Sequence, residues 1–304
     1  MGDPAPRLGL FVFLSLVVGV CLRQLAFADL GFSSIALENV GGSKTVGPWA
    51  LCGVRALFAA VIFATVASSV TSPPIKLNLK MMPTSRLASR AIKVSGLARL
   101  TTFTVQTWTL LGLYFACGSC MSAAVALGAD AAPRPLLACA WVAFEVSWAA
   151  GLLVAMITTF VLIPAMASKG DAAGVDLFFT WKPQLMHNAN VVMLAVDLYL
   201  NDLPISAAHL PFGVLWGIYY VFFAWCWMRN TQGVIYYAFL DPTLDLTKSV
   251  PIHVALLAVF AAFFLFGVAF EQLPHRELLL CVLVPLVTRT RLHGPKPEIQ
   301  KPKA

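Results

Sequence analysis

Histidine and threonine side chains at the starts of two apolar segments are the groups of this 304-residue chain best suited to chemistry. In the later segment, four polar residues follow one another at intervals of 3, 7 and 4 positions: His187, Asn190, Asp197 and Asn201. On a helix these spacings place them on one face. Because hydrocarbon offers polar groups no partner, such a stripe must face the interior of a bundle or a wet cavity. It can serve catalysis, or it can form a seam of hydrogen bonds between helices.

Hydroxyl and amide side chains crowd the start of the earlier segment, at Thr101, Thr102, Thr104, Gln106 and Thr107. Threonine hydroxyls in membrane helices usually bond to backbone carbonyls or to a neighbouring helix. A hydroxyl beside an imidazole, however, forms a nucleophile and general-base pair, which is the minimum unit for acyl transfer. The spacing along the chain leaves open whether the two groups meet.

The composition indicates which class of protein carries these residues. Hydrophobic residues make up 59% of the chain and charged residues 12%, with a mean hydropathy of +0.81. Soluble domains carry about 25% charged residues. The chain is therefore expected to be all-α, a polytopic membrane helix bundle. A disordered chain, a collagen, a disulfide-stapled secreted module and a water-soluble enzyme are excluded.

Several apolar stretches are long enough to cross a ~30 Å hydrocarbon core as helices. Six core transmembrane helices are expected, at residues 49–70, 101–127, 136–166, 186–200, 210–228 and 254–270. An N-terminal apolar segment at 8–22 is either a seventh span or the core of a signal peptide, since the small-x-small sequence Ala26-Phe27-Ala28 follows it. Residues 278–287 are too short to span comfortably and predict an interfacial or re-entrant segment.

Three parts of the chain follow from these segments. Residues 1–28 form the signal peptide or additional transmembrane helix, residues 29–275 the transmembrane bundle, and residues 276–304 the interfacial segment and a basic tail. The tail falls on the far side of the membrane in this topology, where basic residues are unusual.

Basic residues predict the orientation. The loop at 71–100 contains six of them and no acidic residue: Lys76, Lys80, Arg86, Arg90, Lys93 and Arg99. It should therefore lie in the cytosol. The threonine-rich helix and the His187 helix would both begin at this cytosolic face. The same bias explains the net charge of +7 without a nucleic-acid partner.

Ionisable residues inside spans are candidates for function by default. Arg55 and Glu145 are nevertheless expected to be internal ion-pair or hydrogen-bond partners. Cys117 and Cys120 have the spacing of a redox or metal pair, but they lie in an apolar run and are expected to be small packing residues. Since no His, Asp or Glu pair has ligand spacing on one helix face, no metal site is predicted.

Three stretches resemble the androgen-induced protein family of multi-span membrane hydrolases, which includes the androgen-dependent TFPI-regulating protein. Leu100-Thr101-Thr102-Phe103 is similar to the Leu-Thr-Phe motif that supplies the family's nucleophilic threonine. Trp181 and Met186-His187 are similar to the segment that supplies its catalytic histidine. The stretch 233–241, which reads GVIYYAFLD, resembles the signature Gly…Tyr-Pro-Phe-Leu-acidic. The likeness extends over about residues 49–271.

This chain departs from the family pattern at several positions. The doubled threonine leaves two possible nucleophiles, of which Thr102, directly before Phe103, is the better match and Thr101 the alternative. The residues at 183–185 are Pro-Gln-Leu where the family has Asn-His-Gly, Ile235 replaces a Trp, and Ala238 replaces the Pro of the third signature.

The resemblance implies an intramembrane threonine hydrolase that cleaves lipid esters, in particular fatty acid esters of hydroxy fatty acids. Thr102 would be the nucleophile and His187 the base. Gln106 and Asn190, one turn from each, are hypotheses for orienting or oxyanion roles. The expected partners are a lipid substrate from the bilayer and the membrane lipids, with no cofactor and no nucleic acid; the oligomeric state is not predicted.

Two other functions compete with this one. The first is a membrane transporter or receptor-like binding protein that uses the same polar stripe, although the segment 254–270 has no Lys for a retinal Schiff base and no broken helix pair suggests a transporter. The second is a catalytically inactive member of the family. The expected location is the endoplasmic reticulum or another endomembrane, with the plasma membrane as an alternative.

Overall fold

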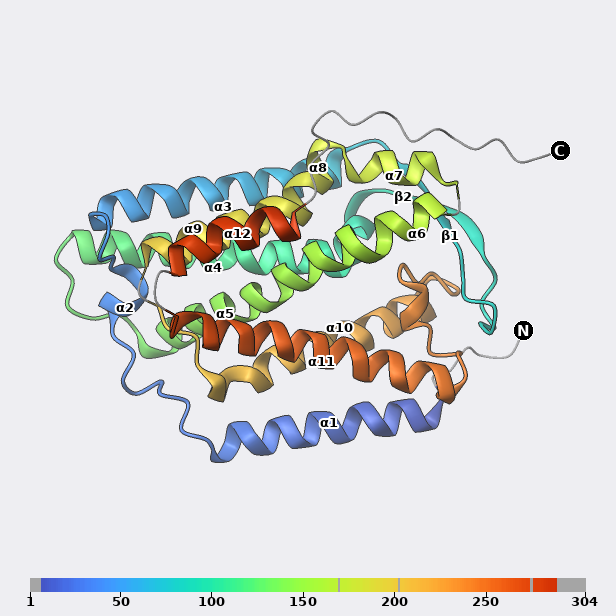
Figure 1. The fold of residues 1–304 in the computed structure, drawn as a ribbon, viewed down its shortest axis with the longest axis horizontal. Coiled ribbons are helices and arrows are strands. Elements are labelled where there is room, and N and C mark those ends of the chain that lie inside the picture. Colours follow the sequence, from blue (N-terminus) through green and yellow to red (C-terminus); the bar gives the residue numbers. More distant parts are fainter. Residues whose placement is uncertain (1–6, 169, 202, 274–275, 289–304) are drawn as a thin grey trace.

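The computed structural model describes residues 7–168, 170–201, 203–273 and 276–288. Within these residues, six helices are long and apolar enough to cross a membrane: Leu8–Phe27, Pro48–Thr71, Phe103–Ala126, Arg134–Ser168, Ala207–Asn230 and Leu246–Glu271. They run back and forth along one axis (Figure 1). The expected all-α helix bundle is therefore confirmed, and the six apolar helices indicate a multi-pass membrane protein.

The long helices are α1 (Leu8–Phe27), α3 (Pro48–Thr71), α4 (Phe103–Ala126), α5 (Arg134–Ile157), α10 (Leu210–Asn230) and α11 (Leu246–Glu271). A π-helical turn, η2 (Thr158–Leu162), continues α5 into α6 (Ile163–Ser168). The expected span at 186–200 is not among the six. It lies within a continuous helix made of α8 (Trp181–Gln184), the π-helical turn η3 (Leu185–Ala189) and α9 (Asn190–Leu200).

Short elements close the two ends of the bundle. At one end, β1 (Ile75–Leu79) pairs antiparallel with β2 (Arg90–Val94) and is followed by the 3₁₀ helix η1 (Gly96–Thr101). This hairpin end also contains α7 (Ala172–Phe178) and the starts of α4, α8 and α11 (Figure 1). The other end, which we call the α2 end, contains α2 (Leu37–Gly41) and the starts of α3, α5 and α10. The basic loop at 71–100 thus forms the hairpin rather than an irregular loop.

Local sequence explains where the helices begin and end. Pro48 occupies the first turn of α3, where its missing N–H costs no hydrogen bond. Thr102 caps α4 by accepting a hydrogen bond from the backbone N–H of Val105. Beyond the other end of α4, Gly128 adopts φ +80°, the left-handed conformation that terminates many helices.

Close packing joins α3 to α4. A Cβ atom added at Gly112 would lie 2.6 Å from Cγ2 of Ile62, so only glycine fits at this contact. Small residues of this kind let membrane helices approach each other. Two buried apolar clusters form the core of the bundle, and Phe103 packs against both.

The N-terminal apolar segment, expected as a signal peptide or a further span, is helix α1. It packs against α10 and α11 and buries Leu10, Leu14 and Cys21. Arg7, just before it, forms an ion pair of 2.6 Å with Asp245. Which of the two roles it has stays a prediction.

The segment expected to be interfacial or re-entrant forms α12 (Arg276–Val287), which packs against α9 and α5 and turns back along the bundle (Figure 1). Its outer face exposes Leu278, Val282 and Leu286. The basic tail at 289–304 lies outside the described residues.

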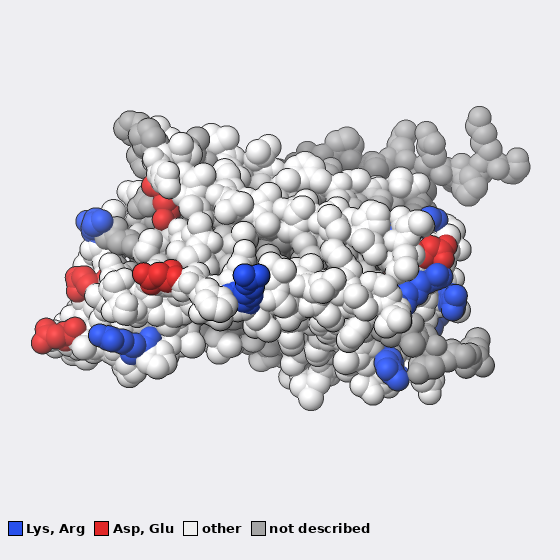
Figure 2. All heavy atoms as spheres, turned by 90° about the horizontal axis from the view of Figure 1, so that it is seen from below, with Lys and Arg blue, Asp and Glu red and all other residues white. Residues whose placement is uncertain are grey.

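Charged side chains gather at the two ends of the molecule, and the surface between them is almost free of charge on the face that Figure 2 shows. A belt with almost no charged side chains on this face, between two charged ends, suits a protein whose middle is surrounded by hydrocarbon.

Candidate functional site

Two basic side chains fasten the starts of α4 and α8 to the end of α3. Arg99, in η1, donates to the carbonyl of Ser69 at 2.9 Å, and Lys182, in α8, donates to the carbonyl of Ser68 at 2.9 Å. The last carbonyls of a helix have no partner within it and carry the negative end of its dipole, so cations are favoured there. Loss of hydration and the nearby Arg99 charge lower the pKa of Lys182. The segments that carry the predicted threonine and histidine are therefore both hydrogen-bonded to the last turns of α3.

His187 is buried in η3, which packs against both α4 and α5. Its ring lies 5.5 Å from that of Phe178, between centroids, and the carbonyl of Pro183 faces it from one turn earlier. Nδ1 of His187 is buried and forms no hydrogen bond with any described residue. π-Helical turns such as η3 are frequent at functional sites. This imidazole thus has an unused nitrogen in an unusual backbone position.

The two candidate nucleophiles have different hydrogen bonds. The Thr101 hydroxyl donates to the carbonyl of Ala98 at 2.7 Å and lies 3.3 Å from the Tyr236 hydroxyl. The Thr102 oxygen accepts a long hydrogen bond, 3.4 Å, from the N–H of Val105. No described residue accepts a hydrogen bond from Thr102. The proton of Thr102, unlike that of Thr101, is therefore free for transfer to a base.

The structure brings Thr102 and His187 to the same end of the bundle but does not join them. No hydrogen bond links His187 to either threonine in the part of the chain that the structure describes. Catalytic hydrogen bonds in ligand-free enzymes are often long and tighten only when the substrate binds. The pairing of these residues stays a prediction.

The two amides proposed for orienting or oxyanion roles differ in how much hydrogen-bonding capacity they keep. Asn190 donates to the carbonyl of Gly151 at 3.3 Å and accepts from the N–H of Val191 at 2.7 Å. Its amide therefore ties α9 to α5. Gln106 retains a buried Oε1 without a partner among the described residues. Neither role is tested by these contacts.

The other half of the predicted polar stripe belongs to a closed network at the α2 end. Asp197 forms a fully buried ion pair with Arg55, with 2.7 Å between Oδ1 and Nε. Tyr114 and Asn201 also donate to Asp197, the latter at 2.7 Å. Arg55 donates in addition to the carbonyl of Val40 at 2.6 Å. The expected internal pairing of Arg55 is confirmed.

Glu145 forms a second closed network at the same end. Its carboxylate lies 2.6 Å from Nδ1 of His209 and accepts the N–H of Ser206 at 2.6 Å. Nε2 of His209 donates to the carbonyl of Leu30 at 2.8 Å. Both nitrogens of this imidazole are therefore used, and the expected internal role of Glu145 is confirmed.

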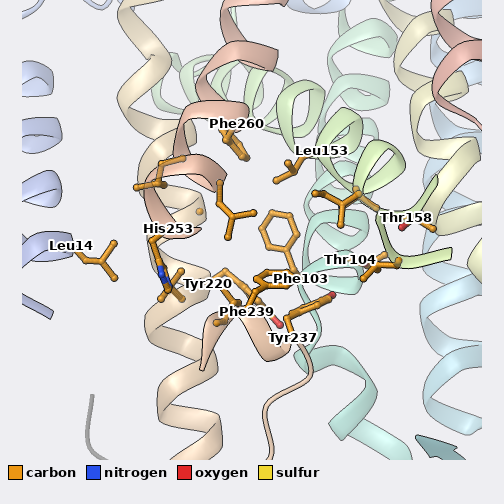
Figure 3. Close-up of a pocket in the computed structure, with 18 residues that line it drawn as sticks. Leu14, Phe103, Thr104, Leu153, Thr158, Tyr220, Tyr237, Phe239, His253 and Phe260 are labelled. Atoms are coloured by element: carbon orange, nitrogen blue, oxygen red, sulfur yellow. The ribbon is translucent and has the colours of Figure 1, made fainter. Parts of the chain in front are cut away.

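A cavity of about 90 Å³ lies at the hairpin half of the bundle, between α1, α4, α5, α10 and α11 (Figure 3). Most of its wall is apolar. The polar or partly polar side chains in it are Thr104, Thr158, Tyr220, Tyr237 and His253.

Tyr237 links the cavity to the start of α4. Its hydroxyl points toward Thr104 in Figure 3. Burial raises the pKa of Tyr237, so the phenol stays protonated at neutral pH. Tyr237 and Phe239 belong to the stretch 233–241, which therefore forms part of the cavity wall.

His253 is a wall residue that the sequence pattern did not single out. Its side chain is 2% exposed, and its Nδ1 lies 2.7 Å from the carbonyl of Ser249. Nε2 is buried and has no partner among the described residues. The available signal was position: His253 directly precedes the apolar stretch that begins at Val254, at the same end as the threonine cluster.

No group of three or more His, Cys, Asp or Glu side chains within the described ranges could hold a metal ion. Cys117 is half-buried and Cys120 exposed, and neither forms a disulfide. Comparison of the chain with protein-family models, with curated proteins and with solved structures finds no significant match.

Proposed function

We propose that the protein is an intramembrane hydrolase of lipid esters, in which Thr102 is the nucleophile and His187 the general base. The observation that carries the proposal is the buried, unbonded Nδ1 of His187 at the same end of the bundle as a hydroxyl whose proton has no acceptor. A base must have a free nitrogen and a nucleophile a free proton. His209 and Thr101 fail these conditions, because their groups are engaged.

The reaction follows from these two groups. As the Thr102 oxygen attacks the ester carbonyl, Nδ1 of His187 takes its proton and then gives it to the departing alkoxide. This step forms an acyl-threonine and releases an alcohol. Water then attacks the acyl-threonine with His187 again as the base, which releases the fatty acid and restores the hydroxyl. The two steps together consume one water and need no cofactor.

The surroundings suit an apolar ester taken from the bilayer. Phe103 and Thr104, directly after Thr102, line the apolar cavity, so a chain bound there would lie next to the nucleophile. The resemblance to the androgen-induced family narrows the class to fatty acid esters of hydroxy fatty acids. The same resemblance favours the endoplasmic reticulum or another endomembrane as the location.

A covalent probe tests the nucleophile directly. Purified protein in detergent is treated with a fluorophosphonate, which phosphonylates activated hydroxyls. We expect labelling of the wild type and of Thr102→Ser, and no labelling of Thr102→Asn, since asparagine keeps the helix cap but lacks the hydroxyl. Thr101→Val is the matched control and should be labelled normally. Full labelling of Thr102→Asn together with loss in Thr101→Val would assign the nucleophile to Thr101.

The base is tested in the same assay. His187→Phe fills the same space without a ring nitrogen, and we expect it to abolish labelling while the protein stays folded. Unchanged labelling of His187→Phe would overturn the proposed mechanism. An unlabelled but folded wild type would favour the binding or transport alternative.

A further inference from the structure

We infer that the cavity around His253 binds the end of a single-chain lipid, whose hydroxyl group donates a hydrogen bond to Nε2 of His253. The cavity is the one proposed above to hold the chain of an ester substrate, but His253 takes no part in the proposed Thr102–His187 chemistry. The inference stands whether or not the protein is a hydrolase, because it rests on the hydrogen bonds of His253, which the hydrolase mechanism does not use.

The hydrogen bonds of His253 determine which kind of partner it lacks. A carbonyl oxygen can only accept, so the nitrogen that bonds Ser249, Nδ1, must carry the proton. In the neutral ring, Nε2 then carries a lone pair and can only accept. A buried acceptor without a donor costs free energy, which a ligand with a donor recovers. The ligand must therefore present an O–H or N–H group at this point.

The wall of the cavity determines the rest of the ligand. Leu153, Leu257 and Phe260 contribute apolar surface, and Leu14 of α1 closes one side (Figure 3). A volume of about 90 Å³ holds several methylene groups, whereas water needs two to four polar partners to be stable in such a space. Thr104 and Tyr237 lie on the opposite side of the cavity from His253 (Figure 3). An apolar chain with one hydroxyl therefore fits better than water.

The need for a hydrogen-bond donor excludes lipids that have the same chain as the proposed ligand but lack its hydroxyl group. A methyl ester has no donor, and an ionised fatty acid only accepts hydrogen bonds. A carboxylate next to a bare nitrogen would also be buried without a counter-charge. The site is thus expected to distinguish a long-chain alcohol, or a hydroxyl on a longer lipid chain, from esters and acids of equal length.

Competition against a photoreactive hexadecanol analogue tests this selectivity on the purified full-length chain. Unlabelled hexadecanol should displace the analogue at about tenfold lower concentration than methyl palmitate or palmitate at pH 7.4, since one hydrogen bond accounts for roughly that factor. 12-Hydroxystearate methyl ester, which carries its hydroxyl within the chain, distinguishes a terminal from an internal donor. Equal displacement by hexadecanol and methyl palmitate would overturn the inference.

Variants assign the selectivity to His253. His253→Phe keeps the volume and removes the acceptor, so hexadecanol should lose its tenfold advantage while methyl palmitate is unaffected. His253→Gln places an amide near the position of Nε2 and should retain part of the advantage. Gly217→Leu fills the cavity and should reduce labelling by all chains, because a Cβ at Gly217 meets only Leu257, at 3.6 Å. An unchanged preference in His253→Phe would contradict the assignment.

A last control separates this site from the proposed active site. Thr102→Asn should bind the hexadecanol analogue as the wild type does, even if it loses fluorophosphonate labelling. Loss of alcohol binding in Thr102→Asn, with binding intact in His253→Phe, would place the alcohol at the hydrolase site and overturn the inference.

Discussion

The buried polar groups at the two ends of the bundle are used differently. At the α2 end, Arg55, Asp197, Glu145 and His209 all have charged or hydrogen-bonding partners. At the hairpin end, the two buried imidazoles each keep one nitrogen without a partner in the described chain. Of the five histidines, three lie within the described residues, so this contrast covers His187, His209 and His253.

This difference distinguishes buried polar groups that stabilise the fold from buried polar groups that remain available for a function. A buried charge is tolerated in an apolar interior only when it is paired and hydrogen-bonded, as the groups at the α2 end are. Such groups have no free capacity for a substrate. An unpaired nitrogen lowers stability and persists most readily where a ligand or reaction uses it. The hairpin end is therefore where we place both the proposed chemistry and the proposed lipid site.

The largest effect on stability should come from opening the ion pair. Asp197→Asn keeps the shape but leaves Arg55 as an uncompensated buried charge, and we expect it to lower the free energy of unfolding by about 3–5 kcal/mol. Equilibrium unfolding in mixed SDS and neutral detergent measures this. The double variant Arg55→Met, Asp197→Leu should recover most of the loss. A change below ~1 kcal/mol in Asp197→Asn would show that the network is not structural.

The second network should have a smaller effect. Glu145→Met leaves the N–H of Ser206 and Nδ1 of His209 without an acceptor, which we expect to cost about 2–3 kcal/mol in the same unfolding assay. Glu145→Gln retains an acceptor oxygen and should cost less. If the glutamine variant is as unstable as the methionine variant, the negative charge of Glu145 contributes more to the free energy of unfolding than its hydrogen bonds do.

At the hairpin end, Thr102 has a modest structural role as a helix cap. Thr102→Ala should lower the free energy of unfolding by about 1 kcal/mol, and Thr102→Asn should restore it because asparagine is a good cap. Neither variant should turn over a lipid ester, which mass spectrometry of the released fatty acid would detect. Ester hydrolysis by the asparagine variant at the wild-type rate would show that Thr102 caps the helix but is not the nucleophile.

The smallest effects on stability are expected at the two unpaired imidazoles. His187→Phe and His253→Phe should each change the free energy of unfolding by less than ~0.5 kcal/mol, because each removes a buried polar atom that lacks a partner, and in His253 this gain offsets the lost hydrogen bond from Nδ1 to Ser249. His187→Phe should nevertheless reduce ester hydrolysis by about 10²–10⁴-fold, the usual contribution of a general base. If either variant were as unstable as Asp197→Asn, the contrast between the two ends would fail.

Part of the site could be predicted from the sequence. The polar stripe and the threonine cluster are visible as residue types at helical spacing, and the basic loop at 71–100 indicated that both begin at one face. The spacing could not show that Asp197 and Asn201 belong to a closed hydrogen-bond network whereas His187 keeps a nitrogen without a partner. This difference depends on Arg55, which lies 142 residues from its partner Asp197 along the chain.

His253 shows why the rest was missed. Its neighbours in the sequence are apolar, and a lone histidine at the start of a span has no distinctive pattern. Its significance comes from the cavity formed with α1, α4, α5 and α10, which are distant in the sequence.

The sequence by itself determined the class of protein, the long apolar helices and the end at which the basic loop lies, because hydropathy and length act locally along the chain. Only the tertiary structure decided which polar groups are paired, that residues 71–100 form a hairpin, and that His187 lies in a π-helical turn. Pairing is a property of helices that meet in space. Since two buried groups satisfy each other only at hydrogen-bond distance, no spacing along the chain can specify it.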